Sequence, residues 1–259
     1  MPMDEAHSAP SILTLADGAT IAYHRTPGKA PGVVFLHGFR SDMTGDKALT
    51  VENWCKTKGH ACVRFDQRGH GRSSGRFEEG TIGQWAADTV AVLAALTEGP
   101  QILVGSSMGG WLMLLAALAG PARIAGLLGI AAAPDFTEDL IAAQLGETER
   151  ARLEAEGVLP MPGPVGEPPI PLTRALIADG RRHLLLRGPI ALSCPVRLLH
   201  GREDDSVPWE TALRLQERLS GPDVRVTLIK DGGHRLSRPE DLALIARELE
   251  ALAQDQTTP

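Results

Sequence analysis

A serine flanked by glycines is the strongest chemical signal in the sequence. Residues 105–109 read GSSMG and fit the pattern G-x-S-x-G, in which a strained turn between a strand and a helix exposes the serine side chain. The apolar run 101–104 precedes this segment and a nearly all-apolar stretch follows it, as such a turn requires. We therefore predict that Ser107 is a nucleophile. Ser106 is the alternative, although it stands at the first variable position of the pattern.

His234 is the predicted general base, because a serine hydroxyl is a weak nucleophile until a base removes its proton. The sequence has eight histidines. Only His234 follows the last predicted strand, in the glycine turn 231–234, and in proteins with this serine turn the histidine comes last in the chain. The alternative for His234 is an ordinary surface-loop histidine. His37 and His200 each end a strand before a glycine, so we expect structural roles for both.

Asp204 is predicted to orient His234, since the histidine needs a carboxylate to select its tautomer and stabilise its charged form. It lies in the segment 200–208, HGREDDSVP, between a predicted strand and a predicted helix. The segment resembles the HGxxDxxVP motif of the α/β-hydrolase superfamily, and this resemblance implies that Asp204 is the acid. Asp205 is expected to cap the following helix. Asp205 and, more remotely, Glu203 are the alternatives for the acid.

Backbone amides are predicted to stabilise the charge that develops on an attacked carbonyl oxygen. One amide belongs to Met108, directly after the nucleophile. The other is expected in the loop 37–39, HGF, and Phe39 is the best candidate. The glycine-rich segment 66–73, DQRGHGRS, is interpreted as a structural turn anchored by its arginine. A phosphate-binding role is disfavoured because no P-loop lysine follows it.

Strands and helices must alternate to position these residues, and the hydrophobic pattern predicts that they do. A hairpin is expected over 11–24, around the turn signal 16–18. The helix 81–96 is expected to bury Ile82, Trp85, Thr89, Val90, Leu93 and Leu96, and the last helix to bury Leu242, Ile245, Leu249 and Leu252. Further strands are predicted over 32–36, 61–65, 101–104, 123–131, 196–199 and 224–229, and further helices over 46–58, 107–119, 207–219 and from Arg238. This order predicts an α/β fold with a mostly parallel sheet covered on both faces.

The alternation breaks between residues 134 and 189, a stretch too long for a simple crossover. It contains a polar helical segment over 138–156, the Pro/Gly-rich run 161–171 and a second helix near 172–186. We predict a small cap over the carboxyl ends of the strands, and a disordered insert is the alternative. The cap residues that argue against disorder, and that are expected to line an apolar cleft, are Leu159, Met161, Ile170, Leu176 and Ile177.

Length, composition and charge limit the domain number and the kinds of partner that are expected. The chain has 259 residues, 43% of them hydrophobic, which fits one domain over 1–259. The net charge of −6 repels phosphate backbones, so nucleic acid is not expected as a partner. The longest apolar stretch, 111–119, is too short to cross a bilayer. Oligomeric state is not indicated.

Neither a disulfide framework nor a metal site is expected. Cys55, Cys62 and Cys194 are an odd number of cysteines without a CxxC pair, so we predict reduced thiols, with a cysteine nucleophile as the remote alternative. No spacing typical of metal ligands appears, and neither a metal nor a cofactor is predicted. The first ten residues are acidic and resemble neither a signal peptide nor a transit peptide, which predicts a cytoplasmic protein.

Together these motifs resemble the α/β-hydrolase superfamily over nearly the whole chain. Three stretches, 45–66, 99–114 and 194–209, resemble a narrower group, the abhydrolase-domain proteins that act in animal mitochondria as palmitoyl-protein thioesterases and acyl-glucuronide esterases. The chain departs from that group in two respects, because its start does not resemble a transit peptide and the segment 134–189 matches least.

The resemblance implies a serine hydrolase for a small acyl ester or an S-acylated substrate, with Ser107, Asp204 and His234 at the positions of a catalytic triad. We expect a preference for medium or long acyl groups, with Trp111 and Trp209 near the site. Two other functions stay open. One is a C–C bond hydrolase with the same triad, and the other is a catalytically weak ligand receptor on the same fold.

Overall fold

A twisted sheet of eight strands forms the centre of the computed structural model, which describes residues 9–162 and 169–254. The strands follow the order β1-β2-β4-β3-β5-β6-β9-β10. β2 pairs antiparallel with β1 and β4, and every later pair is parallel. The bounds are β1 (Ser11–Thr14), β2 (Thr20–Thr26), β3 (Lys29–Leu36), β4 (His60–Phe65), β5 (Gln101–Ser106), β6 (Ile124–Ile130), β9 (Val196–Gly201) and β10 (Val224–Ile229). The expected mostly parallel sheet is confirmed.

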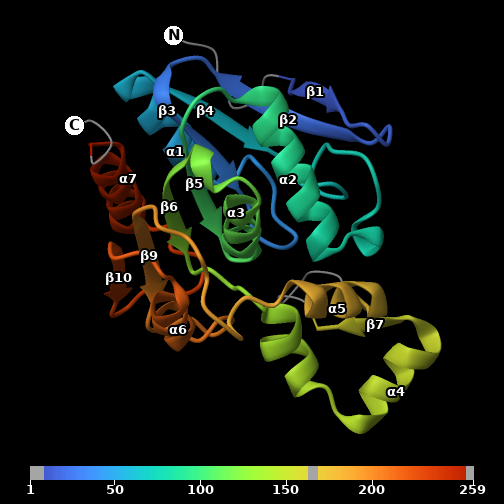
Figure 1. Cartoon of the computed structure of the whole chain (residues 1–259). Coiled ribbons are helices and arrows are strands. Elements are labelled where there is room, and N and C mark those ends of the chain that lie inside the picture. Colours follow the sequence, from blue (N-terminus) through green and yellow to red (C-terminus); the bar gives the residue numbers. More distant parts are fainter. Residues whose placement is uncertain (1–8, 163–168, 255–259) are drawn as a thin grey trace.

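Helices cover both faces of this sheet, as Figure 1 shows. α1 (Asp46–Lys58) and α7 (Pro239–Gln254) pack on one face, and α2 (Ile82–Leu96), α3 (Met108–Ala119) and α6 (Glu210–Arg218) pack on the other. Because both faces are buried, the central strands are apolar throughout rather than alternating with polar residues.

The segment between β6 and β9 lies apart from the two helical layers, at the lower right of Figure 1. It contains three short helical turns, η4 (Thr137–Ile141), η5 (Ala142–Gln144) and η6 (Arg181–His183), two longer helices, α4 (Glu147–Glu156) and α5 (Arg174–Gly180), and a two-stranded sheet of β7 (Val158–Met161) and β8 (Ile170–Thr173). Leu153, Leu159, Leu172, Leu176 and Ile177 are buried and continue the core formed under α2 and α3.

Both ends of this segment are fastened to one carboxylate. Asp135, which is fully buried, accepts hydrogen bonds from the amides of Leu185 (2.7 Å) and Leu186 (2.9 Å). The entry and the exit of the segment therefore meet at Asp135.

Two further contacts join the segment to the body. Asp179 accepts a hydrogen bond from the amide of Gly83 in the first turn of α2 (2.6 Å), and the indole N–H of Trp111 donates to the carbonyl of His183 (3.1 Å). The segment is thus attached at α2 and α3 as well as at its ends.

Four local predictions differ from the structure. The polar helix expected over 138–156 is broken into η4, η5 and α4, because Leu145 and Gly146 leave helical geometry. The helix expected near 172–186 is much shorter, since Ile170–Thr173 pairs with β7 instead. Val90 is 38% exposed, and Val92 takes its place in the core. α6 begins at Glu210 rather than at residue 207.

Some sequence-based interpretations concern residues that lie outside the described ones. These residues are 1–8 of the first ten and 163–168 of the Pro/Gly-rich run 161–171. In the part of the chain that the structure describes, no helix combines the length and apolar character needed to cross a membrane. Across the same ranges, no cluster of three or more His, Cys, Asp or Glu side chains is arranged to hold a metal ion.

Candidate active site

Ser107 occupies a strained turn at the carboxyl end of β5. Its backbone angles are φ 53° and ψ −119°, in a region that side-chain-bearing residues rarely adopt. Hydrogen bonds hold the turn in place: the amide of Ser107 donates to the carbonyl of Ile130 (2.9 Å), and the carbonyl of Ser107 accepts from Gly110 (2.9 Å) and Ala133 (3.1 Å). The helix α3 starts at the next residue, so its N-terminal amides open toward the serine.

Two glycines of the turn are required by close packing. A Cβ on Gly105 would lie 2.4 Å from the carbonyl oxygen of Gly109. A Cβ on Gly109 would lie 2.1 Å from the carbonyl oxygen of Leu36 in β3. Neither neighbour is a flexible side-chain end, so any larger residue would push α3 away from the sheet.

The structure brings Ser107, His234 and Asp204 together, although 127 residues separate the first two along the chain. His234 Nε2 lies 3.1 Å from Ser107 Oγ, and His234 Nδ1 lies 2.8 Å from Asp204 Oδ2. A carboxylate can only accept, so Nδ1 carries the ring proton and Nε2 of the neutral ring is free to accept one. The side chain of His234 is 26% exposed, whereas that of Asp204 is fully buried. Ser106, the alternative nucleophile, is the buried last residue of β5.

Asp204 is held as a carboxylate by four donors. Oδ1 accepts from the amides of Ser206 (2.9 Å) and Val207 (2.8 Å), and Oδ2 contacts His234 and, at 3.2 Å, His200. Burial alone would raise the pKa of Asp204, but the hydrogen bonds from His200, His234 and Val207 hold it well below its usual range.

Asp205 does not cap the following helix, which corrects the expectation. Its carboxylate accepts from the hydroxyl of Ser206 (3.1 Å), and α6 begins only at Glu210. The reason is Pro208, whose carbonyl starts the first turn by accepting from the amide of Thr211 (2.9 Å), so the helix begins beyond the reach of Asp205. Asp205 is exposed, as is Glu203.

The loop after β3 lies against the nucleophile. A Cβ on Gly38 would lie 3.3 Å from Ser107 Cβ, so Phe39 follows a residue that touches the serine. Met108 is the first residue of α3, directly after Ser107. Both predicted amide donors, Phe39 and Met108, therefore belong to segments that border Ser107.

Two buried histidines support this loop. His37 Nε2 accepts from the amide of Gln67 (2.9 Å), and His70 Nε2 accepts from the amide of Arg40 (3.3 Å). Burial lowers the pKa of both His37 and His70 to about 4, so both rings are neutral near pH 7 and can accept these bonds. The structural role expected for His37 agrees with this arrangement.

The glycine-rich turn 66–73 braces the same loop from behind. Asp66 accepts from the amides of Met43 and Arg72, each at 2.8 Å. Arg68 forms a bidentate ion pair with the buried Asp88, in which its Nε and Nη2 lie 3.0 and 2.8 Å from the two carboxylate oxygens. These contacts agree with a structural, arginine-anchored turn.

An open cleft of about 1010 Å³ leads to Ser107 and His234. Its walls combine apolar residues, among them Phe35, Phe39 and Ile170, with charged side chains of both signs. Sequence reasoning missed most of the charged residues, because they come from the loop before α1, from α1 itself and from the turn after His234. The cleft-lining charged residues are Arg40, Asp42, Asp46, Lys47, Glu203, Asp205 and Arg235.

The apolar residues expected from the segment 134–189 contribute little to this cleft. Of the five cap residues proposed for it, only Ile170 lines it. Leu159, Leu176 and Ile177 are buried instead in the apolar core that the segment shares with α2 and α3. Trp111 is fully buried in α3 and does not line the cleft.

Comparison with known proteins identifies the family. Residues 33–244 match the model of the alpha/beta hydrolase family. The chain belongs to the alpha/beta hydrolase family. It is 41% identical over 249 residues to the palmitoyl-protein thioesterase ABHD10, mitochondrial, of Bos taurus, covering 96% of this chain and 81% of the relative.

Solved structures agree with this alpha/beta hydrolase assignment. The alpha/beta hydrolase domain-containing protein 10 from mouse superposes with a TM-score of 0.89 at 40% identity, covering 96% of this chain and 100% of that one. A hydrolase structure from Agrobacterium vitis S4 gives the same TM-score and identity over 95% of this chain and 98% of that one. The predicted α/β-hydrolase fold, the resemblance to the narrower group, and the expectation of an ester or thioester hydrolase are confirmed.

The expectation of a cytoplasmic protein is wrong on this comparison. The ABHD10 relatives from cattle, orangutan, human, mouse and rat are all named as mitochondrial. The expectation depended on the first ten residues alone. These relatives extend beyond the matched region, which spans 81–84% of their length, so the composition of ten residues does not decide the compartment.

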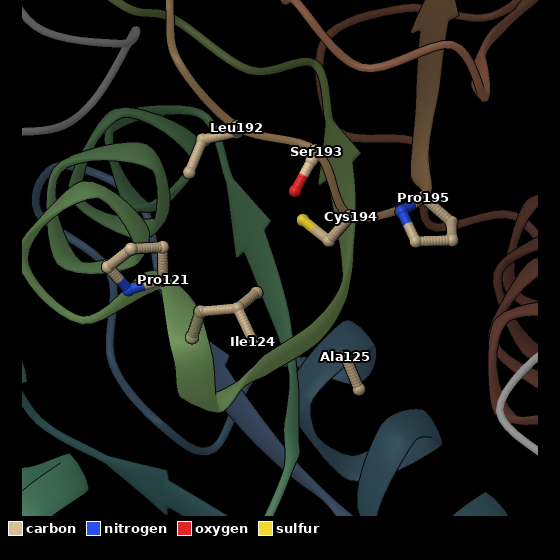
Figure 2. A pocket seen from close by; sticks show the side chains of 7 residues that line it. All are labelled: Pro121, Ile124, Ala125, Leu192, Ser193, Cys194 and Pro195. Carbon is tan, nitrogen blue, oxygen red and sulfur yellow. The ribbon is translucent and has the colours of Figure 1, made fainter.

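Cys194 of this alpha/beta hydrolase lies away from Ser107. Figure 2 shows a small cavity, about 160 Å³, into which the sulfur of Cys194 and the hydroxyl of Ser193 point. It adjoins the first residues of β6 and β9. These are the amino ends of the strands, whereas Ser107 lies at the carboxyl end of β5. Burial raises the pKa of Cys194, and a hydrogen bond with Cys55 together with burial raises that of Cys62. These thiols stay protonated near neutral pH, which disfavours a cysteine nucleophile.

Proposed function

We propose that this alpha/beta hydrolase cleaves acyl thioesters and esters through an acyl-enzyme on Ser107, with His234 as the general base and Asp204 orienting His234. One observation carries the proposal: Nε2 of His234 lies 3.1 Å from the serine oxygen while its Nδ1 faces a buried carboxylate. That geometry is what removal of the serine proton requires.

The proposed reaction has two halves. Ser107 attacks the acyl carbonyl as His234 takes its proton, and the developing oxyanion is stabilised by the amides of Met108 and Phe39, at roughly 3 kcal/mol per donor. His234 then protonates the departing thiolate or alkoxide. In the second half, water attacks the carbonyl of the acyl-enzyme as His234 takes its proton. His234 then returns a proton to the Ser107 oxygen, and the carboxylic acid is released. Asp204 stabilises the imidazolium in both halves.

The acyl group is proposed to contact an aromatic surface beside the nucleophile. The ring of Phe39 lies 4.8 Å from that of Phe77 and 5.6 Å from that of Phe136, and Phe39 and Phe77 are only partly buried. Each buried methylene of an acyl chain would gain about 0.8 kcal/mol there. This supports medium or long acyl groups, in line with the palmitoyl-protein thioesterase name of the bovine relative.

The leaving group is proposed to occupy the charged cleft. Its walls carry side chains of both signs, among them Arg40, Lys47 and Glu203, which suit a polar thiol or alcohol rather than a second acyl chain. An S-acylated peptide or a small acyl ester fits this arrangement. We further propose that residues 1–259 form a single domain and that 134–189 is a cap over the site, as Ile170 lines the cleft from β8.

Substitution of the serine tests the proposal. Ser107→Ala should lower kcat on palmitoyl thioesters by roughly 10⁴- to 10⁶-fold and abolish labelling by a fluorophosphonate probe. Ser106→Ala is the matched control, one residue away in the same turn, and it should keep both activity and labelling. Labelling that persists in Ser107→Ala, or that is lost in Ser106→Ala instead, would contradict the assignment.

A further inference from the structure

A second histidine faces the carboxylate that orients the base. His200 is the penultimate residue of β9, four residues before Asp204, and only 1% of it is exposed. Its Nε2 lies 3.2 Å from Asp204 Oδ2, the same oxygen that His234 Nδ1 contacts at 2.8 Å. Two imidazole rings therefore converge on one carboxylate oxygen.

The tautomer of His200 follows from a second contact. Its Nε2 also lies 3.0 Å from the carbonyl oxygen of Val207. A carbonyl oxygen can only accept, so Nε2 of His200 carries the ring proton. That N–H faces both the Val207 carbonyl and Asp204 Oδ2.

The remaining contacts of Asp204 define its orientation. Oδ1 is occupied by the amides of Ser206 and Val207, at 2.9 and 2.8 Å. Rotation of the carboxylate about its last bond would break these contacts and those to both histidines. His200 therefore supplies the fourth donor to a group that has about four lone-pair positions.

We propose that His200 is a positioning residue for hydrolysis, and that its Nε2–H holds Asp204 ionised and turned so that Oδ2 meets His234 Nδ1. The inference rests on the proposed function, because it assigns His200 a role only through Asp204 and His234. Asp204 stays a carboxylate in spite of its burial, since the donors around it lower its pKa. A purely structural role, in which His200 only ties β9 to Val207, is the competing explanation.

Paired substitutions separate the two explanations. His200→Leu removes the N–H, whereas His200→Gln keeps an N–H donor on a side chain that reaches the same region. We expect His200→Leu to lower kcat on a p-nitrophenyl ester by roughly ten- to a hundredfold at nearly constant KM, as for loss of a supporting hydrogen bond behind an active-site ligand. His200→Gln should recover most of that loss.

A double-mutant cycle gives the deciding readout. If His200 acts through Asp204, His200→Leu should reduce kcat no further in an Asp204→Asn background, because the group it positions is already lost. The same fractional loss in both backgrounds, or an unchanged kcat in His200→Leu, would overturn the inference. Ser107→Ala run alongside tests the proposed function separately: if that variant stays active, the proposed function itself fails.

A measurement on the unaltered protein covers the case in which His200→Leu does not fold. Nitrogen-15 NMR of labelled histidine distinguishes the two neutral tautomers. The inference requires the Nε2–H form for His200 near neutral pH. An Nδ1–H tautomer for His200 would overturn it, since Nε2 would then present no proton to Asp204.

Discussion

Lys47, in the first turn of α1, donates a hydrogen bond to the main-chain carbonyl of Arg235, the residue that follows His234. Its ammonium also lies 3.4 Å from the hydroxyl of Ser237. Burial lowers the pKa of Lys47, which fits an ammonium held in a crowded place between a helix and a loop. The loop that carries the proposed base is thus fastened to a helix 188 residues earlier in the chain.

Lys47→Met should therefore loosen the His234 loop. Loss of a charged donor to a carbonyl is expected to cost roughly 1.5–3 kcal/mol of unfolding free energy and to slow fluorophosphonate labelling of Ser107. Urea unfolding and labelling kinetics measure the two effects. Lys58→Met, which removes only an exposed ion pair with Glu250, is the control and should leave labelling unchanged. Equal labelling rates in Lys47→Met and the unaltered protein would contradict the positioning role.

The neighbouring acids Asp204 and Asp205 should differ sharply. Asp204→Asn should lower kcat by about 10⁴, because an amide in place of the carboxylate favours the wrong histidine tautomer. Asp205→Asn should change kcat little and cost under about 1 kcal/mol, since the exposed carboxylate bonds only to the Ser206 hydroxyl among the contacts of the described residues. Steady-state kinetics and urea unfolding of both variants provide the check. A larger loss of kcat in Asp205→Asn would exchange the two roles.

Acid should destabilise the protein through His37 and His70. Burial lowers the pKa of both rings to about 4, whereas an unfolded chain titrates its histidines near 6.5. As the pH falls from 7 to 5 the unfolded chain takes up protons that the folded protein does not, so stability falls by roughly 2 kcal/mol for each of the two histidines. Urea unfolding at both pH values should give a smaller decrease for His70→Gln. Identical pH dependence in the variant and the unaltered protein would count against buried neutral rings.

Asp135 should contribute more to stability than its half-buried neighbour Glu138. Asp135→Asn replaces one of the two carboxylate oxygens with an NH₂ group. That group would face the amide N–H of Leu185 or Leu186, at an expected cost of roughly 1–3 kcal/mol of unfolding free energy. Glu138→Gln breaks an exposed ion pair with Arg181 and should cost under about 1 kcal/mol. Denaturant unfolding of the two variants compares them directly. Similar costs would mean that the Asp135 contacts are not held in solution.

Activity should increase with acyl chain length, because a longer chain can bury more methylene groups against the aromatic surface around Phe39. The value of kcat/KM is expected to rise by up to about fourfold per buried methylene, the equivalent of about 0.8 kcal/mol. Thioester and oxoester series from about two to sixteen carbons measure the dependence. Phe77→Ala, which leaves the proposed catalytic groups in place, should flatten it. A steady fall beyond about four carbons in both series would indicate a short-chain esterase instead.

The sequence predicted the parts of the fold in which a local pattern coincides with burial. α1 and β10 have the predicted bounds, and the glycines of the segment 105–109 identified the turn around Ser107. Ser107, Asp204 and His234 could be named as candidates because the chain order and the flanking strands favour one residue for each role, with Ser106, Asp205 and Glu203 left as alternatives. Their proximity then follows from the topology of a parallel sheet, whose carboxyl ends meet at one edge.

What the sequence did not predict depends on contacts between distant segments. Val90 is a different kind of error, because helical spacing does distinguish it from Val92. At about 100° per residue Val92 is aligned with the buried Trp85, Thr89 and Leu96, whereas Val90 lies well to the side of that stripe. The pairing of β7 with β8 joins two short segments on either side of a Pro/Gly-rich run. The contact of Lys47 with Arg235 and that of His200 with Asp204 involve residue types common in structural positions, so no spacing rule singles them out.

The meeting of both ends of the proposed cap at Asp135 has a consequence for how the chain can vary. Because the two ends lie together, a change in the length of the segment alters the loop-closure cost by only about 0.6 kcal/mol for each doubling, separate from the contacts that it makes with α2 and α3. Segments of different size can then be exchanged between Asp135 and Leu185 while the sheet keeps its register. A chimaera that carries a cap from another alpha/beta hydrolase should still be labelled at Ser107 by a fluorophosphonate, and only its preference among substrates should change.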